Sequence, residues 1–180
     1  MFYALIRTFA PMKTTLLLVR HGETVDNINL IMQGQTQGKL NETGIRQAEQ
    51  LREELAGATI HAVVASDLKR AVDTATIIAA PHRLTVTTTP LLRERDWGAF
   101  TGRYIPDLKG VPFPDDVESL EALRDRATAF LSFIRMNYSG KTVLAIGHGI
   151  INKAIQAVYY DKQMQEVKKM ANCEVRTLVL

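Results

Sequence analysis

The sequence of 180 residues predicts an α/β fold in three layers (α/β/α), with helices on both faces of a mostly parallel central sheet. Short apolar runs alternate with longer stretches in which apolar residues recur every three or four positions. This is the pattern of buried strands followed by amphipathic helices. Such alternation favours crossover connections between parallel strands. The chain has no internal repeat or linker, and its length suits one domain.

The first predicted elements are a strand, a helix and a second strand. Residues 14–20 form a short apolar run, and so do residues 60–66. Asn41 is a suitable cap for a helix between them. That helix is expected to bury one face, made of Ile45, Ala48, Leu51 and Leu55.

The next predicted elements surround a second helix. Asp67 is expected to cap this helix and Pro81 to end it. Its inward face is expected to hold Leu68, Ala71, Ala75 and Ile78. The β-branched run at residues 84–89 predicts a third strand. Residues 98–114 are rich in glycine and proline without periodicity, which predicts a loop or lid.

The last third of the chain predicts a long helix over residues 117–137, which Ser139 and Gly140 end. Its apolar positions in register are Leu120, Leu123, Ala127, Phe130 and Ile134. A buried strand at 142–147, a helix at 149–158, a short helix around 162–170 and a strand at 175–180 are expected to follow.

Composition narrows the class of protein and its partners. The hydrophobic fraction is 46% and the charged fraction 23%, as in ordinary globular proteins. The net charge is +3 with lysines and arginines scattered, whereas a nucleic-acid surface needs a clustered basic stripe. No apolar run approaches the roughly 20 residues of a membrane helix. We therefore expect neither a nucleic-acid nor a membrane partner.

Cysteine usage and the start of the chain bear on location and domain bounds. The single cysteine, Cys173, cannot form an internal disulfide, which fits a cytoplasmic protein. Residues 1–11 make a poor signal peptide and are interpreted as an N-terminal extension. The domain is expected to comprise residues 12–180, as a monomer or a homodimer.

Reactive side chains follow four predicted strands. Ligands of parallel sheets bind beyond the carboxyl ends of the strands. Arg20 and His21 follow the first strand, and Arg70 lies one helical turn beyond the second. Glu94 follows the third strand and His148 the fourth. These five side chains are therefore expected to converge on one rim of the sheet.

This set of residues suits phosphoryl transfer without a metal or cofactor. Two guanidinium groups match phosphate oxygens, and the helix start after His148 favours an anion. A neutral imidazole can attack phosphorus and hold the phosphoryl group. A protonated carboxyl can give its proton to the leaving oxygen and then take one from water.

The same residues lie in five blocks that resemble the histidine phosphatase superfamily, also called the phosphoglycerate-mutase-like family. Residues 18–24 (LVRHGET) resemble its signature, and the resemblance covers nearly the whole chain from Thr14. The other blocks are at residues 40–48, 66–75, 94–102 and 147–149. Five blocks in the same order argue strongly against a chance match, and they imply a phosphoglycerate-mutase-like fold.

The resemblance implies a role for each matching position. His21 would be the phosphorylated nucleophile, Glu94 the proton donor and acceptor, and His148 a third catalytic group. The phosphoryl group would be held by Arg20, Asn27, Arg70 and His148. The rest of the substrate would face Gln33, Gly34 and Arg95.

Two departures bear on specificity. Residues 35–39 (QTQGK) lack the Asp and the proline that are common in that part of the family pattern. The short stretch before Glu118 and Ser119 resembles the compact phosphatase branch of the family. A short lid favours hydrolysis, because a mutase must exclude water from its intermediate.

Three functions are therefore weighed. The first is a phosphatase that acts on a small phosphorylated metabolite through a phosphohistidine at His21, with phosphohistidine in proteins as an open variant of its substrate. The second is a phosphoglycerate-mutase-type transferase, suggested by Glu94 and Arg95 with Trp97 and Gly98. The third, a non-catalytic phospho-ligand binding module, would need neither nucleophile nor acid.

Overall fold

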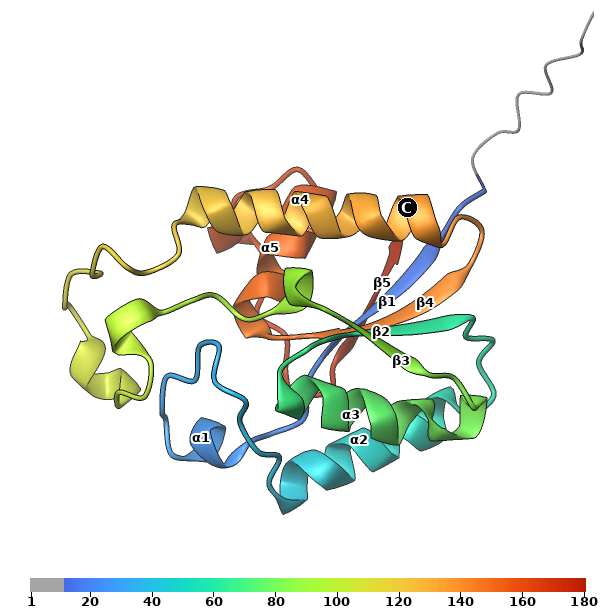
Figure 1. The fold of residues 1–180 in the computed structure, drawn as a ribbon, viewed down its shortest axis with the longest axis horizontal. Coiled ribbons are helices and arrows are strands. Elements are labelled where there is room, and N and C mark those ends of the chain that lie inside the picture. Colours follow the sequence, from blue (N-terminus) through green and yellow to red (C-terminus); the bar gives the residue numbers. More distant parts are fainter. Residues whose placement is uncertain (1–11) are drawn as a thin grey trace, which may run out of the picture.

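The computed structural model describes residues 12–180, and the predicted extension at residues 1–11 lies outside them (Figure 1). A five-stranded sheet has the order β3-β2-β4-β1-β5. The first four strands pair in parallel, and β5 runs antiparallel to β1. The strands are β1 (Thr15–Arg20), β2 (Ala62–Ser66), β3 (Val86–Thr89), β4 (Thr142–Gly147) and β5 (Val175–Val179).

Helices cover both faces of the sheet (Figure 1). On one face lie α2 (Glu42–Leu55) and α3 (Lys69–Ala79), and on the other α4 (Leu120–Asn137) and α5 (Gly149–Tyr159). A single-turn helix, α1 (Val25–Ile28), follows the loop after β1. The predicted three-layer α/β fold with a mostly parallel sheet is confirmed.

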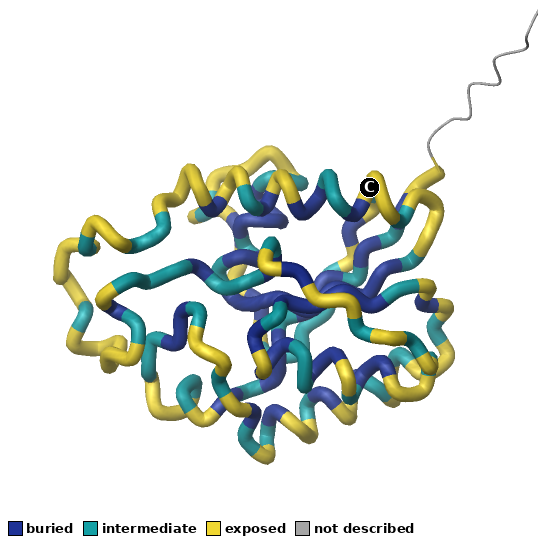
Figure 2. The backbone as a smooth tube through the Cα atoms, in the orientation of Figure 1, coloured by how far each residue is buried: buried dark blue, intermediate teal, exposed yellow. Residues whose placement is uncertain are grey.

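The sheet separates two apolar clusters, because successive side chains of a strand point to opposite faces. Val143 and Ala145 of β4 pack in the cluster beneath α4 and α5. Leu144 and Ile146 pack in the cluster beneath α2 and α3. The central strands are buried along their length (Figure 2). They therefore hold the carboxyl ends of β1, β2 and β4 in fixed positions at one edge.

Two predictions for the helices beside β2 are wrong. Asp67 does not cap α3; its carboxylate accepts a hydrogen bond of 2.7 Å from Arg93 Nε, and Leu68 occupies the N-cap position. Ile45 is 41% exposed, because the buried stripe of α2 consists of Gly44, Ala48 and Leu51. Ile45 lies about 100° around the helix from Gly44.

The C-terminal half also departs from prediction. The long helix begins at Leu120, where the Oγ of Ser119 accepts from the Ala122 N–H, and Leu120 itself is exposed. The expected helix at 162–170 is a single 3₁₀ turn, Met164–Glu166. The lid contains two such turns, Gly98–Phe100 and Ile105–Leu108. Among residues 12–180, no helix combines the length and apolar character that crossing a bilayer requires.

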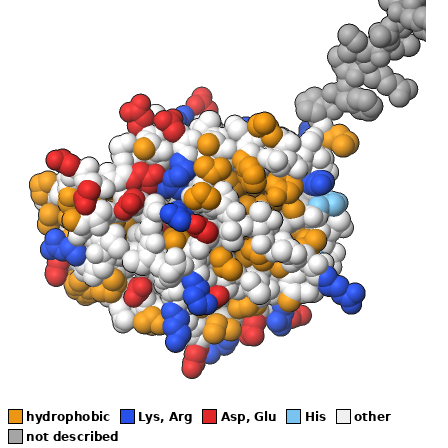
Figure 3. Space-filling view, viewed as in Figure 1, with side chains coloured by type: hydrophobic (Ala, Val, Ile, Leu, Met, Phe, Trp, Pro, Cys, Tyr) orange, Lys and Arg blue, Asp and Glu red, His pale blue; other side chains and the backbone are white. Residues whose placement is uncertain are grey.

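The surface carries both signs of charge. On the face shown in Figure 3, lysine and arginine side chains lie among aspartates and glutamates rather than in a stripe. In α3, Lys69 pairs with Asp73 of the same helix at 2.7 Å. This distribution on the visible face agrees with the scattered charge of the sequence.

Candidate active site

A cavity of about 260 Å³ opens at the carboxyl ends of β1, β2 and β4. Most of the predicted site residues line it: Arg20, His21, Asn27, Gln33, Gly34, Arg70 and Glu94. His148 lies beside them, with its ring centroid 5.0 Å from that of His21. The predicted convergence of residues from separate parts of the chain is therefore present.

His21 presents one ring nitrogen to this cavity. Its Nδ1 lies 2.7 Å from the carbonyl oxygen of Gly22, and because a carbonyl only accepts, Nδ1 carries the hydrogen. Burial, followed by the charge of Arg70, lowers the pKa of His21 well below its usual value. The ring is therefore neutral near pH 7, and its Nε2 keeps a lone pair.

His148 has the opposite tautomer. Its Nδ1 accepts a hydrogen bond of 3.2 Å from Nε of Arg70, which leaves the hydrogen on Nε2. Burial and then Arg70 lower the pKa of His148 well below its usual value, so this ring is also neutral. Its buried Nε2 has no hydrogen-bond partner among the described residues. The two rings thus offer a lone pair at His21 and an N–H donor at His148.

Arg70 is the most deeply buried cation of the site, at 1% exposure. Its Nη2 donates to the Gly34 carbonyl at 2.8 Å, and its Nη1 donates to the carbonyl of Thr36. Burial lowers the pKa of Arg70 to about 10, so it stays protonated at neutral pH. Gly38, at a φ of +65°, passes close to it: a β-carbon there would lie 2.9 Å from Arg70 Cδ.

The segment that precedes β5 holds Arg20 and His21 in place. Arg20 Nη1 donates to the Met170 carbonyl at 2.9 Å, while its buried Nε has no partner within residues 12–180. The Asn172 side chain donates to the His21 carbonyl at 2.9 Å and reaches Asn27 Oδ1 at 3.5 Å. Because Oδ1 of Asn27 accepts from Asn172 and from the Thr24 N–H, its Nδ2 donor is left for the cavity.

Glu94 occupies the start of α5. Its Oε1 accepts from the N–H groups of Arg95, Ile150 and Ile151 at 2.8, 3.1 and 3.2 Å. The start of α5 was predicted to favour the substrate anion. The N–H groups of Ile150 and Ile151 in its first turn instead bind the carboxyl group of Glu94. A methyl added at Gly149 would lie 3.6 Å from both Glu94 Oε2 and Arg20 Nε. Glu94 and Arg20 therefore flank the same point.

The family model for the histidine phosphatase superfamily (branch 1) matches residues 16–180. The chain belongs to the histidine phosphatase superfamily. The predicted family is thus confirmed, and the chain is an enzyme of the phosphatase and phosphoglycerate mutase family rather than a binding module.

Relatives of this histidine phosphatase carry names of both activities. It is 35% identical over 162 residues to a metal-independent phosphoserine phosphatase of Arabidopsis thaliana, covering 79% of this chain and 67% of that protein. It is 32% identical over 185 residues to a phosphoglycerate mutase-like protein 4 of the same plant, covering 92% and 79%. A phosphoserine phosphatase of Entamoeba histolytica, solved with 3-phosphoglyceric acid, superposes with a TM-score of 0.80 at 25% identity, covering 91% and 89%.

Arg95 was predicted to face the substrate, but it does not line the cavity. It is 7% exposed, and its Nε donates to the Glu118 carbonyl at 2.8 Å. Its guanidinium carbon lies 4.6 Å from the centre of the Trp97 ring and 5.2 Å from that of Phe113. Arg95 therefore supports the lid by hydrogen bonding and cation–π contact.

Gln33 and Gly34 do lie at the cavity, in different ways. Gln33 is 8% exposed, and its Oε1 has no hydrogen-bond partner in the described part of the chain. Gly34 supplies the carbonyl that Arg70 contacts. Gln33 is thus the member of the pair that offers a free side-chain acceptor.

The side of the cavity nearer to solvent was not predicted. Its residues are partly or fully exposed, and we call them the outer wall: Ile31, Met32, Trp97, Ile105, Ile150 and Lys169. They come from four separate segments, and apart from Trp97 they lie outside the five blocks that resemble the family. Asn172 is equally unmarked, since its role depends on β5 pairing with β1.

The described residues 12–180 contain no cluster of three or more His, Cys, Asp or Glu side chains placed to hold a metal ion. The charges available to an anion in the cavity are guanidinium groups, with Lys169 at the outer wall.

Proposed function

We propose that the protein hydrolyses small phosphomonoesters by moving the phosphoryl group first to Nε2 of His21 and then to water. One observation carries the proposal: two buried neutral imidazoles have opposite tautomers beside a buried guanidinium. A lone pair aimed at phosphorus next to donors for its oxygens is the arrangement that phosphoryl transfer needs.

In the first step, Nε2 of His21 forms a bond to phosphorus as the bond from phosphorus to the leaving oxygen breaks. Arg20, Arg70, Nδ2 of Asn27 and the N–H of His148 donate to the transferring oxygens. Protonated Glu94 gives its proton to the leaving oxygen, so the product departs as an alcohol. The positive charge of the two arginines offsets the charge that spreads over the phosphoryl oxygens.

In the second step, water attacks the phosphohistidine. Glu94, now ionised, takes a proton from the water as the water oxygen bonds to phosphorus. The phosphorus–nitrogen bond breaks, inorganic phosphate forms, and His21 returns to its neutral state. The partly exposed outer wall leaves the cavity open to that water, which favours hydrolysis over retransfer.

We propose a small substrate that carries a carboxylate in addition to the phosphate. A cavity of about 260 Å³ has room for little more than a phosphoryl group and a few carbon atoms. Lys169 supplies a cation apart from the two arginines. The names of the relatives point the same way, since they include phosphoserine phosphatases and a complex with 3-phosphoglyceric acid.

We also propose that residues 12–180 form one functional domain that works in the cytoplasm. Both apolar clusters draw on strands from the two halves of the chain, which supports a single folding unit. Cys173 is a free thiol, and burial raises its pKa to about 12, which suits a reducing compartment in which it stays inert. Fractionation of cells that express the full chain tests the location.

The test is turnover of 4-nitrophenyl phosphate with a chelator present, together with acid-quench trapping of the phosphoenzyme. Replacing His21 with asparagine should lower kcat by about 10⁴-fold or more and abolish the phosphoenzyme. His61→Asn is a matched control, because this ring is exposed and accepts a hydrogen bond from the Thr142 N–H at the start of β4. A His21→Asn variant that turns over near the wild-type rate would refute the proposal. Isomerisation of a phosphoglycerate faster than its hydrolysis would instead establish a mutase.

A further inference from the structure

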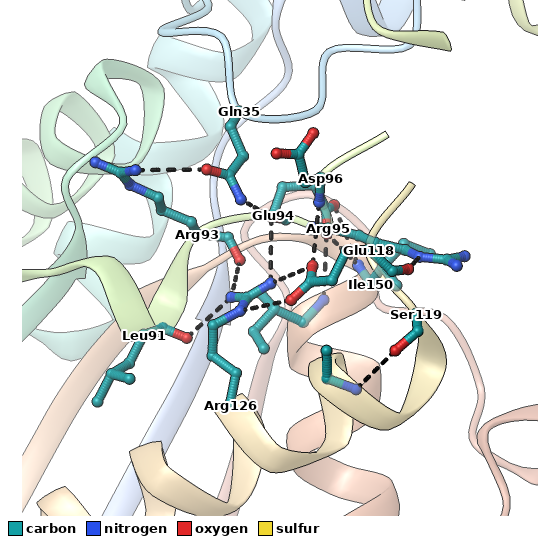
Figure 4. Close-up of polar contacts among 12 residues, drawn as sticks. Gln35, Leu91, Arg93, Glu94, Arg95, Asp96, Glu118, Ser119, Arg126 and Ile150 are labelled. Carbon is teal, nitrogen blue, oxygen red and sulfur yellow. Dashed lines mark hydrogen bonds and ion pairs between the residues drawn. The ribbon is translucent and has the colours of Figure 1, made fainter. Parts of the chain in front are cut away.

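The segment that carries Glu94 has little regular structure of its own. Residues 90–92 form a 3₁₀ turn, and residues 93–97 belong to neither a helix nor a strand. Main-chain carbonyls in such a segment need partners from elsewhere. Three of them, those of Leu91, Arg93 and Glu94, accept hydrogen bonds from one side chain of α4, Arg126 (Figure 4).

Arg126 is itself held by Glu118. Its Nε lies 2.9 Å from Oε1 and its Nη2 2.7 Å from Oε2, which is a bidentate pair. The two side chains are only 16% and 14% exposed, so solvent screens the pair little. Glu118 Oε2 also accepts from the Asp96 N–H at 3.1 Å. The pair thus holds the segment through its carbonyls before Glu94 and through an N–H after it (Figure 4).

Two helices therefore fix Glu94, one at its carboxyl group and the other at its main chain. The N–H groups of Ile150 and Ile151 in α5 bind its carboxylate. Arg126 binds the main-chain carbonyls of Glu94 and Arg93 from α4. Neither Arg126 nor Glu118 lines the cavity, and their hydrogen bonds reach it through the segment that carries Glu94. The pKa of His148 is lowered first by burial and least by the charge of Arg126, and Arg126→Lys keeps that charge.

We propose that Arg126, paired with Glu118, is a positioning residue that sets where Glu94 presents its proton to the leaving oxygen. The inference rests on the proposed function, since it needs Glu94 to be the acid. A lysine could keep the charge but not the planar fork that reaches a carboxylate and several carbonyls at once.

The dependence on the leaving group separates positioning from general damage. The phenolate of phenyl phosphate is a poor leaving group that needs a proton. The dinitrophenolate of 2,4-dinitrophenyl phosphate is a good leaving group and departs almost without one. Glu94→Gln should lower kcat/KM, which reports formation of the phosphoenzyme, by about 10²- to 10³-fold for phenyl phosphate and spare it for the dinitrophenyl ester. The hydrolysis of the phosphoenzyme, which also uses Glu94, is common to both esters and does not enter kcat/KM. Arg126→Met should show the same selectivity at about ten- to thirtyfold, and Arg126→Lys a smaller loss of the same kind.

The control is Arg124→Met, two positions away on α4, where the arginine is half exposed and lies 3.9 Å from Asp161. This variant should hydrolyse both esters at the wild-type rate. Arg126→Lys keeps the buried charge, so it provides the same comparison if Arg126→Met does not fold.

Two failures are distinguishable. If Arg126→Met and Arg126→Lys slow both esters equally while Glu94→Gln is selective, Arg126 has only a structural role and the inference is overturned. If Glu94→Gln itself lowers kcat/KM equally for both esters, the acid role in the proposed function falls, and the inference falls with it.

Discussion

The inner and outer parts of the cavity are built on different principles. The inner part, made of Arg20, His21, Arg70 and His148, consists of polar groups of which all but Arg20 are almost completely buried. The outer wall is mostly apolar and partly exposed, with Ile105 at 43%. Inside, each nitrogen of the Arg70 guanidinium donates to a protein acceptor, and Nδ1 of each histidine has a partner. The comparison teaches that this fold fixes the phosphoryl end strictly and leaves the other end of the substrate loosely defined.

Electrostatics sharpens this difference. Burial raises the strength of each charge and hydrogen bond at the inner groups, because little water competes there. An exposed cation such as Lys169 is screened by solvent and salt. Substitutions inside should therefore have large effects on every substrate, and those at the outer wall small effects on some.

The largest of the effects that test this comparison is expected from Arg70→Met. Loss of the buried guanidinium should lower kcat/KM by about 10²- to 10³-fold for all phosphomonoesters and weaken inhibition by inorganic phosphate similarly. Arg46→Met is the matched control, since that arginine is 67% exposed on α2 and should be silent. Steady-state kinetics on three unrelated esters provides the measurement. A loss confined to one ester would contradict the distinction between inner and outer parts.

An effect of intermediate size concerns stability against pH. The native pKa values of His21 and His148 lie well below 6.5, their approximate value in the unfolded chain. Below pH 6.5 the unfolded state therefore binds protons that the native state does not, and the free energy of unfolding falls. This stabilising contribution is fully present above pH 6.5 and decreases as the pH falls toward the native pKa values.

His21→Asn should make the protein less sensitive to acid. It removes one of these groups, so the loss of unfolding free energy between pH 6.5 and 5.5 should shrink by up to about 1 kcal/mol. Urea denaturation at both pH values measures the difference. A loss equal to that of the wild type would show that His21 is not held neutral by burial.

The smallest effect is expected at the outer wall. Lys169→Met should reduce kcat/KM for phosphoserine by about two- to fivefold relative to 4-nitrophenyl phosphate, the range that an exposed ion pair allows. Lys168→Met is the control, because Lys168 is adjacent in sequence but does not line the cavity, and this variant should leave the kcat/KM ratio of the two esters unchanged. An equal loss with both esters would assign Lys169 to the phosphate rather than to the carboxylate.

Much of the site was predictable from where residues fall relative to strands. Arg20 is the last residue of β1, His21 and His148 follow β1 and β4 directly, and parallel strands bring such positions to one edge. The errors concern side chains whose partners lie far away in the sequence. Asp67 pairs with Arg93 instead of capping α3, and Arg95 packs against Phe113 and the carbonyl of Glu118. These partners lie 18 or more positions away in the sequence, which no local pattern could reveal.

The alternation of strands and helices follows from the order of residues alone, because periodicity is a local property of the chain, and it places the reactive residues at one edge of the sheet. The protonation and hydrogen bonding of those residues follow only from how the layers pack. This packing places Nε of Arg70 on Nδ1 of His148, 78 positions later, and it fills the first turn of α5 with the carboxylate of Glu94. Tautomers, burial and hydrogen-bond partners depend on groups distant in sequence, so they are settled when the layers pack.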